Sequence, residues 1–148
     1  MSQHQTLHAA RTIHAGASIG TFVREAGFAT WNRYAAVNDE FVPIHMDDEA
    51  GRAAGMESAF GMGNLQWAYL HNIVRQWAGD SGHILELSCQ FRKPNLKGKV
   101  TATGVVKDVT EVDGGTKVTL VIWTEDGSGD KLAPGTAVVF LPTPAPAG

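Results

Sequence analysis

The sequence predicts an α+β fold in which an antiparallel sheet wraps around one long helix. Two observations predict it. Residues 62–78 carry apolar side chains at helical spacing around most of the circumference, which is typical of a helix surrounded by protein. From residue 82 onward the pattern changes to alternation with period two, in segments rich in Val and Thr. Consecutive strands with short connections pair antiparallel, so the second half of the chain predicts the sheet.

Shorter elements precede the long helix. We expect a strand at 21–24, a helix at 31–37, a loop at 38–46 and a short helix that ends near Gly55. Thr30 is a plausible N-cap of the first helix, and Asp47 or Asp48 can cap the second. The first twenty residues show no strong periodicity, which indicates a loosely ordered arm. Its histidines share no ligand spacing with other residues, so no metal site is predicted there.

Four strands are expected after the long helix, at 84–91, 99–112, 116–123 and 136–141. The run Asp113-Gly114-Gly115 is a strong hairpin signal, and residues 125–129 are a looser turn. The first strand alternates apolar and polar side chains, which favours Cys89 as a buried, inert thiol. The tail 142–148 contains three prolines and is expected to be flexible.

The composition bounds the class of protein. The chain has 148 residues, of which 43% are hydrophobic, which suits one domain over 1–148 with an ordered core at about 20–141. A net charge of −3 and a pI near 6.0 argue against a nucleic-acid partner. A single cysteine fits a reducing compartment, and no apolar run approaches the ~20 residues of a membrane span. We therefore expect a cytoplasmic protein without a membrane partner.

The most informative segment is Tyr34 to Met62, and its centre is the pair Glu40 and His45. These residues lie five positions apart across Pro43, so one short loop carries a carboxylate and an imidazole. That pair can take a proton from water and return one to carbon. The alternative is a solvated glutamate beside a histidine that only caps a helix. A metal site that adds neighbouring acidic residues to His45 is also possible, but helix capping explains those acids more simply.

The loop resembles a known catalytic loop. Tyr34, Ala35, Pro43, His45 and Asp47 match, without a gap, the pattern Tyr-Ala-x-x-Ser-Gly-Asp-x-Asn-Pro-x-His-x-Asp. This is the loop of MaoC-like hydratases and dehydratases, the hot-dog-fold family that includes (R)-specific enoyl-CoA hydratases. The resemblance covers about residues 20–141 and implies a hot-dog fold.

The resemblance also implies roles for individual residues. Glu40 stands at the family's catalytic aspartate, His45 at its histidine, and Gly63 at the oxyanion turn before the long helix. The chain departs from the pattern at Glu40, which is one methylene longer, and at Val42, where the family has asparagine. Asp39 is a spare carboxylate beside them.

The implied activity is the syn addition or removal of water at C2–C3 of an enoyl thioester. The expected catalytic set is Glu40, His45 and Gly63, and the expected substrate-binding set is Val42, Asn64, Arg92 and Lys93. The cluster Arg92 to Lys99 could meet the phosphates of coenzyme A or form a solvated strand edge. No cofactor or metal is expected beyond coenzyme A as part of the substrate. The family implies a homodimer or larger assembly, or a hetero-oligomer with a related subunit. A non-catalytic acyl-CoA-binding subunit and a hot-dog thioesterase remain alternatives.

Overall fold

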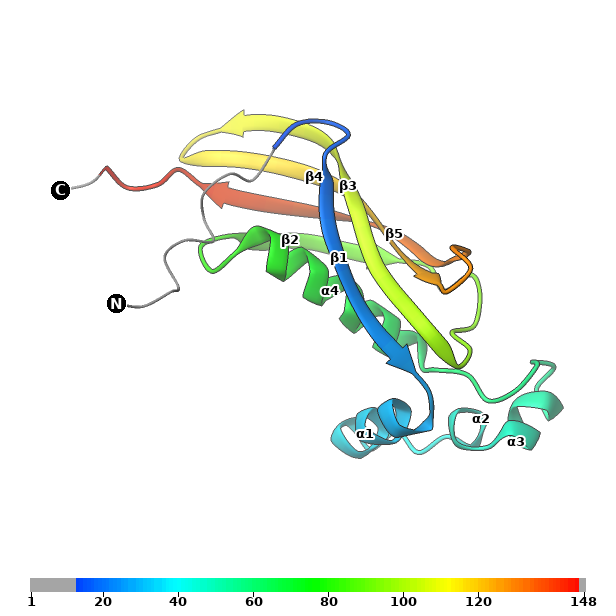
Figure 1. The fold of residues 1–148 in the computed structure, drawn as a ribbon. Helices are drawn as coiled ribbons and strands as arrows, with labels where there is room; N and C mark the ends of the chain where they lie inside the picture. Colours follow the sequence, from blue (N-terminus) through cyan, green and yellow to red (C-terminus); the bar gives the residue numbers. More distant parts are fainter. Residues whose placement is uncertain (1–12, 147–148) are drawn as a thin grey trace, which may run out of the picture.

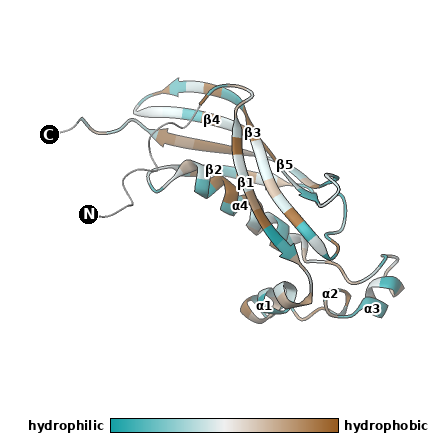
Figure 2. Cartoon of the chain, viewed as in Figure 1, coloured by the Kyte–Doolittle hydropathy of each residue, from teal (hydrophilic) through white to brown (hydrophobic). Residues whose placement is uncertain are grey.

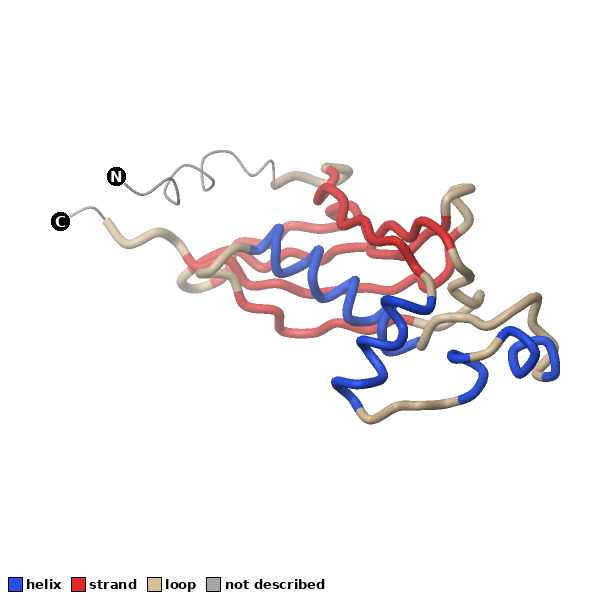
Figure 3. The backbone as a smooth tube through the Cα atoms, turned by 60° about the horizontal axis from the view of Figure 1, so that its bottom comes forward, coloured by secondary structure: helices blue, strands red, loops and turns tan. Residues whose placement is uncertain are grey.

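The computed structural model describes residues 13–146 and forms a five-stranded antiparallel sheet in the order β1-β3-β4-β5-β2 (Figure 1). The elements in chain order are β1 Ser18–Ala26, α1 Phe28–Asn38, α2 Pro43–Met46, α3 Asp48–Ala53, α4 Gly63–Ala78, β2 His83–Cys89, β3 Gly98–Val112, β4 Gly115–Asp126 and β5 Lys131–Pro142. Helix α4 crosses one face of the sheet, as Figure 3 shows. The predicted α+β, hot-dog architecture is confirmed.

The core lies between α4 and the sheet. On the helix, Leu70, Ile73 and Val74 are at most 1% exposed, and Leu120 and Ile122 of β4 are fully buried beneath them. Each such side chain contributes roughly 1.5–3 kcal/mol when it leaves water. The polar arc of the helix stays in solvent, because Asn64, Asn72 and Arg75 are all exposed. In Figure 2 the brown, apolar colour follows most of β5, which is the strand between β4 and the edge strand β2.

Strand β2 differs from its predicted form. It covers His83–Cys89 rather than 84–91, and its register against β5 shifts between Ile84 and Glu86. This bulge inserts Leu85 as an extra residue and turns its side chain outward, so that it is 60% exposed. Because β2 is an edge strand, its Cys89 is only half-buried, although that burial raises the pKa of the thiol.

The other strands are longer than predicted. Strands β3 and β4 meet in the predicted hairpin at Asp113–Gly114, where Gly114 has a φ of +80°. Strand β5 continues to Pro142, the first residue of the expected tail, and the Thr143 N–H donates to the Gly114 carbonyl at 2.9 Å. Strand β1 begins at Ser18, within the predicted arm. Residues 1–12 and 147–148 lie outside the described part of the chain.

The three short helices lie together beyond the end of the sheet where β1 ends (Figure 1). Helix α1 begins at Phe28, and the predicted N-cap is wrong because the Thr30 hydroxyl donates to the Glu25 carbonyl instead. Helix α2 occupies part of the predicted loop. The predicted cap of α3 is confirmed, since the Asp47 carboxylate accepts from two N–H groups in the first turn. Within residues 13–146, no helix combines the length and apolarity that a membrane crossing requires.

Candidate functional site

His45 is held in α2 with one defined ring orientation. The side chain is 7% exposed, and its Nδ1 lies 2.6 Å from the Phe60 carbonyl oxygen. Because a carbonyl only accepts, Nδ1 must carry the proton, and in the neutral ring the lone pair then belongs to Nε2. The Phe60 ring packs edge-on against the imidazole with centroids 5.2 Å apart. The sequence places a histidine here, and the fold makes its Nε2 the basic nitrogen.

The segment that orients His45 is itself fixed by two contacts. The Phe60 N–H donates to the Ile44 carbonyl at 3.3 Å, and the neighbouring Ala59 N–H donates to the Asp48 carboxylate at 3.1 Å. Lys97 Nζ approaches the same carboxylate to 2.7 Å. The hydrogen bond from Lys97, followed by the one from Ala59, lowers the pKa of the Asp48 carboxyl. Asp48 is therefore ionised at neutral pH. Its carboxylate ties the start of α3 to Ala59, which precedes the Phe60 carbonyl that contacts His45.

Glu40 stands just after α1, where the chain reverses. Asp39 adopts the left-handed conformation at φ 53°, and the Glu40 N–H donates to the Ala35 carbonyl at 3.0 Å. Burial, and after it the nearby Glu40 carboxylate, raises the pKa of the Tyr34 hydroxyl. Glu40 itself is half-buried. Within residues 13–146 its carboxylate makes no direct hydrogen bond or ion pair, including to His45.

The start of α4 offers free backbone donors. Gly63 and Asn64 are its first two residues, and within the described chain neither N–H has an acceptor. The Gly61 N–H is not available in the same way, because it donates to the Asn95 carbonyl at 2.8 Å. A 16-residue helix adds the positive end of its dipole at this point. The Gly63 N–H can thus receive an oxygen that gains negative charge.

The space beside the two glycines is occupied by the protein's own aromatic residues. A Cβ at Gly61 would lie 2.7 Å from Trp31 Nε1, and a Cβ at Gly63 would lie 2.7 Å from two Phe91 ring carbons. The space on the Cβ side of the two glycines is therefore taken by Trp31 of α1 and by Phe91. Trp31 Nε1 is also a buried donor without a partner in the described residues.

The loop around Glu40 exposes apolar side chains. Val42 is 39% exposed, Phe41 61% and Val37 84%. Val42 precedes Pro43 and its carbonyl accepts from the His45 N–H, so it is close in the chain to both candidate acid/base residues. An apolar wall beside these groups suits the hydrocarbon part of a ligand.

The basic cluster 92–99 does not gather its charges at one point. Lys93 lies 3.5 Å from Asp130, and Lys97 is bound to Asp48. Arg92 donates to the neutral Gln90 side chain, and neither Arg92 nor Lys99 has an ion pair in the described chain. The cluster borders a groove of about 410 Å³.

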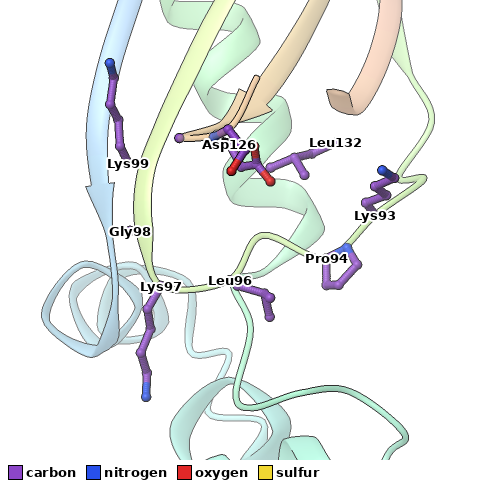
Figure 4. Close-up of a pocket in the computed structure, with 10 residues that line it drawn as sticks. Lys93, Pro94, Leu96, Lys97, Gly98, Lys99, Asp126 and Leu132 are labelled. Atoms are coloured by element: carbon purple, nitrogen blue, oxygen red, sulfur yellow. Dashed lines mark hydrogen bonds between the residues drawn. The ribbon is translucent and has the colours of Figure 1, made fainter. Parts of the chain in front are cut away.

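Figure 4 shows how the charges sit around this groove. The Lys97 and Lys99 side chains point away from each other, and the Asp126 carboxylate lies beside Leu132. Most of the cluster lies in the connection between β2 and β3 and not on a strand edge, and its charged side chains do not converge on one point.

Several residues of the site were not identifiable from the sequence. The Phe60 carbonyl is a backbone group, and the Asp48–Lys97 pair joins positions that are 49 residues apart. Asp48 had a sequence signal only as a helix cap, and Phe91 only as an apolar strand residue. Gln66 had no sequence signal at all. It is a buried glutamine on the otherwise apolar face of α4, where the helical pattern predicts an apolar residue.

Comparisons with known proteins agree on the fold. No protein-family model and no curated protein matches the sequence. Among solved structures, the (R)-hydratase from A. caviae involved in PHA biosynthesis is 26% identical, with a TM-score of 0.78, over 90% of this chain and 100% of that one. The MaoC-like dehydratase from Rhodospirillum rubrum is 18% identical, with a TM-score of 0.69, over 90% and 96%.

A third match is an assembly of two different subunits. The ChsH1-ChsH2 complex from Mycobacterium tuberculosis matches at 19% identity and a TM-score of 0.74, over 87% of this chain and 98% of the matched chain. The expected resemblance is therefore confirmed at the level of structure: nearly the whole chain has the hot-dog fold of (R)-hydratases and MaoC-like dehydratases, at low sequence identity.

Proposed function

We propose that the protein is an enoyl-thioester hydratase, or a dehydratase in the reverse direction. The observation that carries the proposal is the coincidence of a full-length structural match to an (R)-hydratase with a buried His45 whose Nε2 is basic. The free Gly63 N–H at the start of α4 supports it further. Addition of water to a conjugated thioester needs a base, an acid and a donor to the carbonyl oxygen, and Glu40, His45 and the Gly63 N–H are proposed to supply them.

In the proposed reaction the thioester oxygen accepts a hydrogen bond from the Gly63 N–H. A water between Glu40 and His45 loses a proton to this pair as its oxygen bonds to C3. The electrons of the C2–C3 double bond move toward the thioester, and the negative charge on its oxygen is stabilised by the helix N-terminus. The pair then delivers a proton to C2. Because both steps use one face of the substrate, the addition is syn.

The remaining candidate residues have proposed roles in binding. Val42 borders the acyl side of the site, where an apolar wall discriminates substrates by shape at roughly 1–3 kcal/mol per methylene. Exposed Asn64 follows Gly63 and faces the carrier end of the thioester. Arg92 and Lys93 are placed as contacts to the carrier phosphates, although each already has a polar partner in the described chain.

The test measures turnover of trans-2-enoyl-CoAs by the purified protein, with substrates of several chain lengths and with branching at C3. The reaction is monitored as the loss of the conjugated-thioester absorbance. We expect Glu40→Gln and His45→Ala each to lose about 100-fold or more in rate, the usual effect of a missing general acid or base. Asp39→Asn is the matched control, because asparagine tolerates the left-handed backbone found there.

Three outcomes would contradict the assignment. Wild-type protein that is inactive on the whole panel would reject hydratase activity. Loss of activity in Asp39→Asn but not in Glu40→Gln would move the carboxylate role to Asp39. Release of free coenzyme A, detected with a thiol reagent, would instead identify a thioesterase.

We also propose that the chain self-associates through the β2 edge and the exposed side of α4. Trp67 is 41% exposed and Leu85 60%, and β2 has no neighbour on its outer side within the described residues. An unpaired edge strand with apolar side chains is a template for pairing with another chain. Sedimentation of the purified protein tests this, since a single species near 15.8 kDa would reject it.

A second candidate function is a non-catalytic acyl-CoA-binding subunit. Val42 in place of the family's asparagine, within an exposed apolar loop, favours it, and the ChsH1-ChsH2 complex shows that this fold occurs in assemblies of two different chains. In that case the purified protein would bind a saturated acyl-CoA and turn over no enoyl-CoA. Mixing it with a related hot-dog subunit would then produce a mixed species in native mass spectrometry.

A further inference from the structure

Phe91 is a large apolar side chain that remains 53% exposed next to the start of α4. Its direction is fixed by its neighbours. Gln90 and Arg92 join their side chains through a 2.7 Å hydrogen bond from Arg92 Nε, which places both on one side of the extended chain. Their backbone N–H groups donate to the Pro134 and Leu132 carbonyls at 2.9 and 3.0 Å. In an extended segment with alternating side chains, Phe91 must point to the opposite side.

On that side the ring meets Gly63. A Cβ at Gly63 would lie 2.7 Å from Phe91 Cδ2 and Cε2 and 3.1 Å from Cγ, closer than real Cβ contacts allow. The φ of Gly63 lies outside the left-handed region, so its backbone conformation does not require glycine. The space taken by the Phe91 ring does require it. Glycine at 63 and phenylalanine at 91 therefore form a matched pair.

The pair borders the donor that the proposed reaction uses. Gly63 is the first residue of α4, and its N–H has no acceptor in the described chain. A half-exposed phenyl ring packed on the same residue covers one side of that donor with apolar surface. An N–H shielded from water on one side stabilises developing charge more strongly than one that is fully hydrated.

We propose that Phe91 is a positioning residue that forms an apolar wall of the thioester site, so that the substrate carbonyl is held against the Gly63 N–H without water on that side. This rests on the proposed function. It predicts that removal of the ring admits water beside the donor. Removal of an oxyanion donor itself typically lowers kcat by about 10²–10³-fold. Removal of the Phe91 ring should have a smaller effect, and we expect a loss of about tenfold in kcat.

The experiment compares Phe91→Ala, Phe91→Leu and the control Val23→Ala. Val23 is also an exposed apolar strand residue, at 43%, but lies on β1. We expect Phe91→Ala to lose about tenfold in kcat/KM on a short enoyl-CoA, mainly in kcat, and to bind butyryl-CoA more weakly in calorimetry. Phe91→Leu should recover most of both, and Val23→Ala should match wild type.

The coupling with Gly63 supplies a second readout. Gly63→Ala should displace the ring and lose activity, whereas Gly63→Ala combined with Phe91→Ala should lose less than the two effects added, because the vacated space accepts the new methyl group. Sedimentation of each variant separates this role from assembly.

Three results would overturn the inference. One is a Phe91→Ala variant with wild-type turnover and butyryl-CoA binding, and another is a loss that follows dissociation of the oligomer. The third is a wild-type protein that turns over no substrate and whose binding of butyryl-CoA is the same as that of Phe91→Ala. This includes the case in which neither protein binds butyryl-CoA. Wild-type protein that is inactive but binds butyryl-CoA more tightly than Phe91→Ala would reject the hydratase function alone and retain the wall.

Discussion

Thr124 of β4 anchors the first turn of α4, and its replacement by valine is the sharpest test of this arrangement. The residue is fully buried, and its hydroxyl donates to the Gln66 side-chain oxygen. The Thr124 hydroxyl oxygen also accepts a hydrogen bond from the Ala133 N–H at 3.1 Å. Valine keeps the shape and removes both bonds. Two buried polar groups are then left unpaired, at roughly 1–3 kcal/mol each. We expect Thr124→Val to lower the free energy of unfolding by about 2–6 kcal/mol.

Denaturant unfolding at fixed protein concentration measures this loss. Thr119→Val is the matched control, because Thr119 is a half-buried threonine of the same strand without a side-chain hydrogen bond in the described chain. Its effect should stay within about 0.5 kcal/mol. Adding Gln66→Leu to Thr124→Val should restore part of the stability, since only the Ala133 N–H is then unpaired. If Thr124→Val and Thr119→Val differ by less than about 0.5 kcal/mol, the buried bonds do not hold α4 as argued.

Two further predictions concern the segment beneath His45. Gly51→Ala would place a Cβ 2.1 Å from the Ser58 carbonyl oxygen, a backbone atom that cannot step aside, so denaturant unfolding should show a loss at the upper end of about 1–3 kcal/mol. Gly127→Ala, whose nearest neighbour would be 3.8 Å away, should change little, and equal effects would reject the argument. Asp48→Asn should lower the melting temperature at pH 7. Because the folded pKa of Asp48 is lowered, its contribution is complete above the unfolded value of about 3.9 and disappears as the pH falls through the folded value. A difference from wild type that persists undiminished at pH 3 would contradict this.

The elements that could be predicted from the sequence are those with a long periodic signal. Helix α4 was expected at 62–78 and lies at Gly63–Ala78, and the β3–β4 hairpin turns where Asp113-Gly114 indicated. The sequence-based predictions were wrong at positions where tertiary contacts override local preference. The Thr30 hydroxyl bonds to the end of β1 instead of capping α1. The bulge at Leu85 depends on pairing with β5, which alternation alone does not reveal.

The candidate site divides in the same way. The loop motif placed Glu40 and His45 on one short segment, and the helix signal placed Gly63 at the start of α4. Their roles stay predictions. The supports of these residues are contacts between distant positions or backbone groups, such as the Phe60 carbonyl on the imidazole. Neither residue type nor local spacing marks such contacts, so they required the fold.

The connection between β2 and β3 has a larger part in the site than its sequence suggests. Within eight residues it packs Phe91 on Gly63, bonds the Asn95 carbonyl to the Gly61 N–H, and pairs Lys97 with Asp48. These contacts reach the donor at the helix start, the turn before it and the segment that orients His45. One connection thus fixes the candidate oxyanion donor relative to the candidate base, although the two come from different helices. Changes in residues 90–97 should therefore alter turnover even where they leave the binding of an acyl thioester intact, because the relative placement of reacting groups affects rate more steeply than it affects affinity.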